Sequence, residues 1–69
     1  MFDRKRLQAQ MVLRGESADS ISKKLGINTS TFYRKMGNDG DFTRAEIGQI
    51  IDILKIEDPM SIFFANDIA

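Results

Sequence analysis

The fold is decided by residues 17–36, which read SADSISKKLGINTSTFYRKM. Ser17 is a preferred helix N-cap, and it precedes Ile21 and Leu25, which stand one helical turn apart. Gly26 follows directly and tolerates the positive φ angle at which many helices end. We therefore expect a short helix that begins after Ser17 and ends at Gly26.

A second helix is expected at about residues 29–37. The run Thr29–Thr31 offers three candidate N-caps, and the apolar Phe32 and Met36 lie on one side of the helix. Small Ser22 allows the two helices to approach closely, and two short helices that meet at a glycine-containing turn form a helix-turn-helix. The apolar residues of this unit predict an inner seam of Ile21, Leu25, Ile27, Phe32 and Met36.

This segment resembles the helix-turn-helix of the Cro/repressor-type (XRE-like) family of small phage and bacterial regulators. The resemblance is carried by Ile21-Ser22, by Leu25-Gly26-Ile27 and by the polar run that precedes Phe32. Members of the family also place one helix before the unit and two after it. Two positions depart from the pattern: Ala18 stands where many members have a glutamine that supports the first recognition residue, and Glu16 stands where an apolar residue is usual.

In this family the second helix of the unit enters the major groove, and its N-terminal residues reach base edges. The resemblance implies that Thr29, Ser30 and Arg34 read bases, and Arg34 is suited to bind guanine O6 and N7 in bidentate fashion. It also implies phosphate contacts from lysines of the unit and from the N-terminus of the next helix. The predicted DNA-binding residues are Lys23, Lys24, Asn28, Thr29, Ser30, Thr31, Tyr33, Arg34, Lys35, Thr43 and Arg44.

The residues before this unit predict another helix, which runs to about Arg14. Asp3 is a suitable N-cap for it, and Gly15 is a suitable residue at its end. The apolar face is expected to consist of Leu7 and Met11, one turn apart, widened by Val12 and Leu13.

Two more helices are expected in the second half of the chain. Thr43 and Glu46 form a capping box for the first of them, whose apolar face is expected to comprise Ile47, Ile50, Ile51 and Leu54. Asp58 and Pro59 supply the cap and the first-turn proline of the last helix, which is expected to run to about Asn66. No stretch alternates apolar and polar residues in the manner of a strand. The sequence therefore predicts an all-α fold: one domain, residues 1–69, built as a compact bundle of five short helices with a repressor-like helix-turn-helix.

The charges divide the chain into two halves. The net charge of the 69 residues is zero, but residues 1–37 carry eight basic and three acidic side chains, a net of +5, and residues 38–69 carry two basic and seven acidic ones, a net of −5. A basic half favours contact with phosphate, whereas an acidic half faces solvent or a protein. We therefore expect double-stranded operator DNA as the partner. The alternative is an interaction module with the same fold that binds and modulates another regulatory protein.

Catalysis, cofactors and metal sites have no support in the sequence. The chain has no Cys and no His, and its hydroxyl groups have no nearby base to activate them. Asp39, Asp41, Glu57 and Asp58 match no EF-hand spacing, so we assign them to turns and caps. No apolar run approaches the roughly 20 residues that span a bilayer, which leads us to expect a cytoplasmic protein without a membrane partner.

The apolar run Ile62-Phe63-Phe64 is expected first to be part of the core, since a fold of 69 residues needs its large side chains inside. Three consecutive bulky residues cannot all face inward from a helix, so at least one of them is expected to be partly exposed. An exposed apolar residue near the end of the fold favours a symmetric homodimer on DNA.

Overall fold

A computed structural model describes residues 2–64, and five α-helices account for most of them. The helices are α1 (Arg4–Arg14), α2 (Ala18–Leu25), α3 (Thr29–Gly37), α4 (Arg44–Leu54) and α5 (Met60–Phe63). The all-helical prediction is confirmed, since residues 2–64 contain no strand. None of the described helices has the length and apolar character that crossing a membrane requires.

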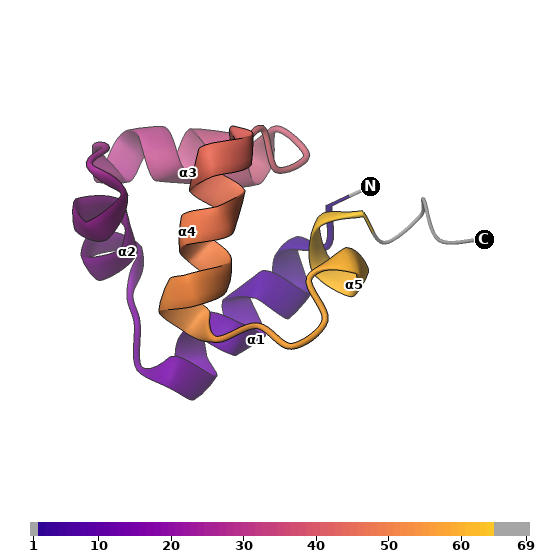
Figure 1. Ribbon diagram of the computed structural model, residues 1–69. Helices are drawn as coiled ribbons and strands as arrows, with labels where there is room; N and C mark the ends of the chain where they lie inside the picture. The colour runs from indigo at the N-terminus through magenta and orange to yellow at the C-terminus, as the bar shows by residue number, and fades with distance from the viewer. Residues whose placement is uncertain (1, 65–69) are drawn as a thin grey trace.

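The helices form a small bundle in which α3 lies across one end and α1 across the other, with α4 running between them (Figure 1). The α2 helix packs against α3 and α4, while α1 packs against α4 and α5. The buried apolar residues form one cluster at the centre: Phe2, Leu7, Met11, Ala18, Ile21, Phe32, Met36, Phe42, Ile50, Leu54, Ile56, Ile62 and Phe63. The predicted inner seam is part of this cluster, with Ile21, Phe32 and Met36 buried and Leu25 and Ile27 half-buried against them.

Local caps explain where three of the helices begin. Asp3 accepts a hydrogen bond from the Arg6 backbone at 3.1 Å, and Ser17 accepts one from the Ser20 backbone at 3.1 Å. Thr43 caps α4 in the predicted box, since its hydroxyl accepts from the Glu46 backbone while the Glu46 carboxylate accepts from the Thr43 backbone. Each cap satisfies N–H groups that the first turn of a helix leaves open.

Gly26 ends α2 as predicted, at a φ of +75° that an L side chain rarely adopts. Its N–H bonds the carbonyl of Lys23, and the N–H of Ile27 bonds the carbonyl of Ser22 at 3.0 Å. Only three residues, Gly26 to Asn28, therefore connect α2 to α3. This short connection holds α3 against α2.

Two phenylalanines that the sequence did not assign to the core belong to it. The ring of Phe42 lies 5.7 Å from that of Phe32 and 6.0 Å from that of Phe2, and Phe2 is 5.8 Å from Phe63. Gly40 leaves space for Phe2, because a Cβ at this position would overlap its ring. These aromatic contacts tie the N-terminal segment to both α3 and α5.

The predicted widening of the apolar face of α1 is wrong. Val12 is 81% exposed and Leu13 67% exposed, whereas Leu7 and Met11 are buried. An α-helix turns by about 100° per residue, so one and two positions beyond Met11 the side chains have rotated away from the core.

Two predicted helix starts are also corrected. The cap of α3 is Asn28, not one of Thr29–Thr31, and its side chain makes no capping hydrogen bond. The α5 helix begins at Met60, one residue later than predicted, and Asp58 does not cap it: the Asp58 backbone carbonyl instead accepts from the Ser61 hydroxyl at 2.9 Å.

The α5 helix also ends early, at Phe63, since Phe64 has already left the helical conformation. The predicted end at Asn66 lies outside the described residues. The expectation that one residue of Ile62-Phe63-Phe64 is exposed is confirmed, since Phe64 is 40% exposed and the other two are buried.

Candidate nucleic-acid interface

The outward side of α3 carries polar side chains at helical spacing. Ser30, Tyr33 and Arg34 occupy positions i, i+3 and i+4, and all three are exposed. Tyr33 is 62% exposed, and the guanidinium of Arg34 makes no hydrogen bond or ion pair with any of residues 2–64. We call these three residues, together with the exposed Asn28 that precedes the helix, the outer face of α3.

The opposite side of α3 anchors the helix. Phe32 and Met36 are buried against α2 and the rest of the core, and Ser22 on α2 is 1% exposed. A small side chain at this position lets the two helices approach closely, as the sequence predicts. The outer face is therefore held on a helix whose inner side is fixed by packing.

Thr29, predicted to read bases, is bonded to α2. Its hydroxyl donates to the Asp19 carboxylate at 2.8 Å, and its oxygen lies 3.1 Å from the Ser22 hydroxyl. Ala18 is buried, and the neighbouring Asp19 is the residue of α2 whose carboxylate bonds the Thr29 hydroxyl. The sequence reading missed Asp19, although Asp19 and Ser22 stand three apart on the side of α2 that meets α3.

Lys35 lies between α3 and α4. Its ammonium pairs with the Glu46 carboxylate at 2.8 Å, and the two side chains are only 13% and 12% exposed. Burial raises the pKa of Glu46, but hydrogen bonds from Lys35 and the Thr43 backbone outweigh it, so that the pKa lies below its ordinary value. The Lys35 ammonium, which was predicted to contact phosphate, is thus bonded to Glu46 within the protein. The Thr43 hydroxyl, also predicted to bind DNA, accepts the capping hydrogen bond from the Glu46 backbone.

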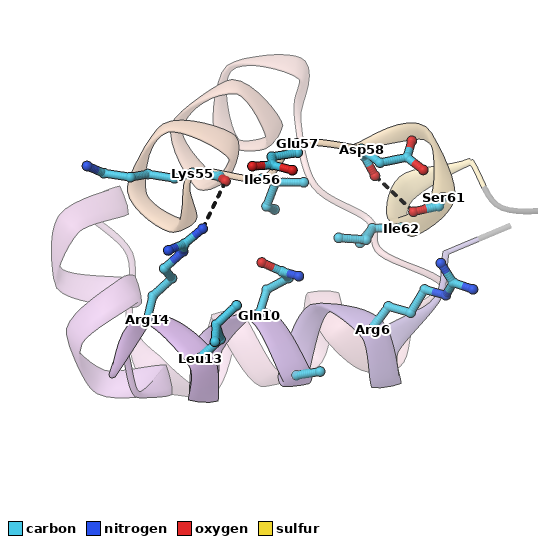
Figure 2. A pocket seen from close by; sticks show the side chains of 11 residues that line it. Arg6, Gln10, Leu13, Arg14, Lys55, Ile56, Glu57, Asp58, Ser61 and Ile62 are labelled. Carbon is cyan, nitrogen blue, oxygen red and sulfur yellow. Dashed lines mark hydrogen bonds between the residues drawn. The ribbon is translucent and has the colours of Figure 1, made fainter.

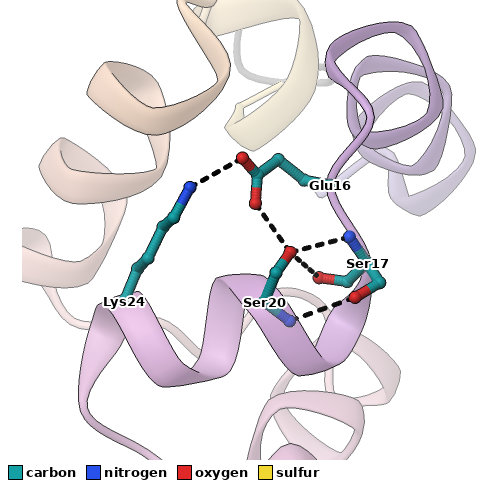
Figure 3. Close-up of polar contacts among 4 residues, drawn as sticks. All are labelled: Glu16, Ser17, Ser20 and Lys24. Atoms are coloured by element: carbon teal, nitrogen blue, oxygen red, sulfur yellow. Dashed lines mark hydrogen bonds and ion pairs between the residues drawn. The ribbon is translucent and has the colours of Figure 1, made fainter.

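Lys24 forms a second ion pair, with Glu16 in the linker between α1 and α2 (Figure 3). The ammonium lies 2.7 Å from one carboxylate oxygen, and the Ser20 hydroxyl donates to the other at 2.6 Å. The hydrogen bond from Lys24 lowers the pKa of Glu16 below its ordinary value, and that from Ser20 lowers it further. Glu16 thus links the chain before α2 to the last turn of that helix.

The remaining predicted residues surround the outer face. Lys23 is exposed in the last turn of α2, just before the connection to α3, and Arg44 is exposed as the first residue of α4. Thr31 is half-buried on α3. Exposed cations therefore precede and follow α3 in the chain, and lysine and arginine are among the side chains that contact phosphate oxygens in protein–DNA complexes.

A groove of about 460 Å³ lies elsewhere, between α1 and the connection from α4 to α5 (Figure 2). Leu13 and Ile56 contribute apolar walls, Arg6 and Arg14 lie on the α1 side, and Asp58 lies on the opposite side. Arg14 closes one end, where its guanidinium donates to the backbone carbonyl of Leu54 at 2.8 Å. Residues 2–64 contain no group of three acidic side chains arranged to hold a metal ion.

Comparison of the chain with protein-family models, with curated proteins and with solved structures finds no match. The candidate interface is defined by its own geometry. Its helix is fixed on the inner side. The outer side carries a phenol, a hydroxyl and an exposed guanidinium that has no partner among residues 2–64, and exposed cations lie in the adjoining helices. Such a surface can donate hydrogen bonds to base edges and to phosphate oxygens.

Proposed function

We propose that this protein is a helix-turn-helix transcriptional regulator of the repressor type, which reads operator DNA through the outer face of α3. The single observation that carries the proposal is that Arg34 is exposed and has no partner among residues 2–64, whereas the neighbouring Lys35 is paired with Glu46. The connection over Gly26 and the packing of α2 on α3 also support it, because they match the two-helix unit that the sequence predicts.

In the proposed complex α3 enters the major groove. Arg34 binds guanine O6 and N7 through two parallel hydrogen bonds, and the Ser30 hydroxyl reaches a neighbouring base edge. Tyr33 donates its hydroxyl proton to a phosphate, while Lys23 and Arg44 contact phosphates on either side of the groove. A homodimer would place two such helices in half-sites about one helical turn apart, near 34 Å.

The dimer contact that we propose is the exposed apolar surface at the end of the described chain. Met60 is 46% exposed and Phe64 is 40% exposed, on a fold that buries Ile62 and Phe63 beside them. A two-fold axis through such a patch covers the same residues of both copies.

The test is a titration of the protein against labelled DNA that flanks its own gene, at two salt concentrations. Arg34→Ala is expected to weaken specific binding by roughly 5- to 150-fold, the equivalent of about 1–3 kcal/mol, without a change in melting temperature. Lys5→Ala is the matched control, since it removes one exposed cation from α1 and should leave specificity intact. Parent binding should weaken steeply with salt, because phosphate contacts release counterions. Binding that is absent at both salt concentrations, or unaffected by Arg34→Ala, contradicts the proposal.

The second candidate is the protein-interaction module, and the groove between α1 and the α4–α5 connection favours it. Leu13 is exposed at the edge of this groove, where Ile56 and Ile62 also contribute apolar atoms. A protein bound there would depend on apolar contact, so its affinity would change little with salt. A Leu13→Asp substitution would abolish such binding and leave DNA affinity unchanged.

A further inference from the structure

The hydroxyl of Thr29 has a single proton, and the structure shows where it goes. Its oxygen lies 2.8 Å from Oδ1 of Asp19, and a carboxylate can only accept. Thr29 is therefore the donor in this hydrogen bond. Since a hydroxyl carries only one proton, Thr29 can donate to no other group while the bond to Asp19 persists.

Ser22 does not change this assignment. Its hydroxyl lies 3.0 Å from the backbone carbonyl of Asp19 and 3.1 Å from the Thr29 oxygen. The carbonyl only accepts, so the Ser22 proton points either to that carbonyl or to Thr29. In both cases the Thr29 oxygen keeps at least one lone pair, and Asp19 keeps its second carboxylate oxygen, which bonds no group in residues 2–64.

The position of this pair gives it access to a ligand of α3. Thr29 is the first residue of the helix and is half-buried, and Asp19 is exposed in the first turn of α2. The pair thus presents two acceptor oxygens and no proton at the N-terminal end of the outer face, whereas Arg34, further along the helix, presents only donors.

We infer that Thr29 and Asp19 form an acceptor subsite that selects an exocyclic amino group, the N6 of adenine or the N4 of cytosine, in the DNA that α3 reads. In the major groove these amino groups donate, while guanine presents the acceptors O6 and N7 and thymine presents the acceptor O4. A keto oxygen opposite the pair would leave acceptors facing each other with no proton between them. The inference rests on the proposed function, and it adds a preference for adenine or cytosine at one position of the operator.

The experiment is a selection of binding sites from randomised duplex DNA by the parent protein and by isosteric variants. For the parent, one position of the site should favour adenine or cytosine over guanine or thymine by about tenfold, as one hydrogen bond made or lost implies. Thr29→Val removes one acceptor and the hydrogen bond that positions the other, the Asp19 carboxylate, so it should abolish this preference. Asp19→Asn introduces a donor in place of an acceptor, so guanine and thymine should become tolerated at the same position.

Two controls separate this preference from general effects on folding or affinity. Thr29→Ser retains the hydroxyl and should keep the preference for an amino group. Arg34→Ala should abolish the preference for guanine at a different position and leave the amino-group position unchanged. A melting curve of each variant confirms that the selected sites are those of a folded protein.

The possible failures can be told apart. If the preference for adenine or cytosine survives both Thr29→Val and Asp19→Asn, the subsite is overturned. The subsite is also overturned if the parent prefers guanine or thymine at one position and Thr29→Val removes that preference. If the sites enriched by the parent protein show only the guanine preference that depends on Arg34, the subsite is overturned and the proposed function still stands. If the parent enriches no sequence at low salt, the proposed function fails and the subsite fails with it.

Discussion

Arg34 and Lys35 are consecutive cations on α3, and they belong to two different sides of it. Lys35 is turned inward, where its ammonium meets Glu46 at 2.8 Å in a site that is nearly closed to solvent. Arg34 is turned outward and pairs with nothing in residues 2–64. A rotation of about 100° per residue is enough to separate a side chain that holds the fold from one that is available to a ligand. The count of basic residues in a segment therefore overstates how many can reach DNA.

The difference between the two sides of α3 should be largest when the neighbouring aromatic residues Phe32 and Tyr33 are each replaced by alanine. Phe32→Ala opens a cavity in the core and should cost about 3–5 kcal/mol, as much as the whole stability of many domains of this size. Tyr33→Ala removes a ring that is mostly exposed and should cost about 1 kcal/mol or less. Thermal unfolding followed by circular dichroism measures both. Equal losses for the two variants would contradict the assigned sides.

A second test exchanges the adjacent cations for methionine. Lys35→Met leaves the Glu46 carboxylate without its partner in a nearly buried site, so it should lower the free energy of unfolding by about 1–2 kcal/mol. Arg34→Met should change that free energy by less than about 0.5 kcal/mol. Urea unfolding of the two variants gives the values. The account fails if Arg34→Met is the more destabilising of the two.

The smallest expected effect is a dependence of stability on acidic pH. The pKa values of Glu46 and Glu16 are lowered in the folded protein, so each carboxylate stabilises the fold above its ordinary pKa of 4.5. That contribution is lost as the pH falls through the lower, folded-state pKa. The melting temperature should therefore be steady from about pH 6 to pH 5 and decline below about pH 4.5.

Glu46→Gln should make this decline shallower, because the substituted side chain no longer titrates. Glu57→Gln is the matched control, since Glu57 is exposed and makes no hydrogen bond in the described part of the chain. An identical acid slope for the parent and for Glu46→Gln would show that the Lys35–Glu46 pair does not contribute.

The features that the sequence predicts well are those set by neighbours within one helical turn. Ser17 and Thr43 cap their helices as expected, and Gly26 adopts its positive φ angle. The inner seam around Phe32 also follows from helical spacing alone. The caps and the seam depend on residues that are three or four positions apart, whose geometry a helix fixes, and Gly26 depends only on its own lack of a side chain.

The features that the sequence does not predict depend on contacts between helices. Lys35 and Glu46 are 11 residues apart, and their pairing depends on how α4 packs beside α3. Thr29 was expected to be a free base reader or a cap, but the approach of α2 brings its hydroxyl to Asp19, ten residues earlier in the chain. Leu13 is apolar yet 67% exposed, because the side of α1 on which it lies borders the open groove and not the packed core.

We propose that the outer face of α3, and not the groove beside α1, is the functional surface. A residue-resolved NMR titration of the protein with its selected duplex DNA tests this directly. The account predicts amide shift changes at Asn28, Ser30, Tyr33 and Arg34 and at the start of α4, with the signals of Leu13 and Ile56 unmoved. Changes concentrated at the groove, or none in α3, would contradict it.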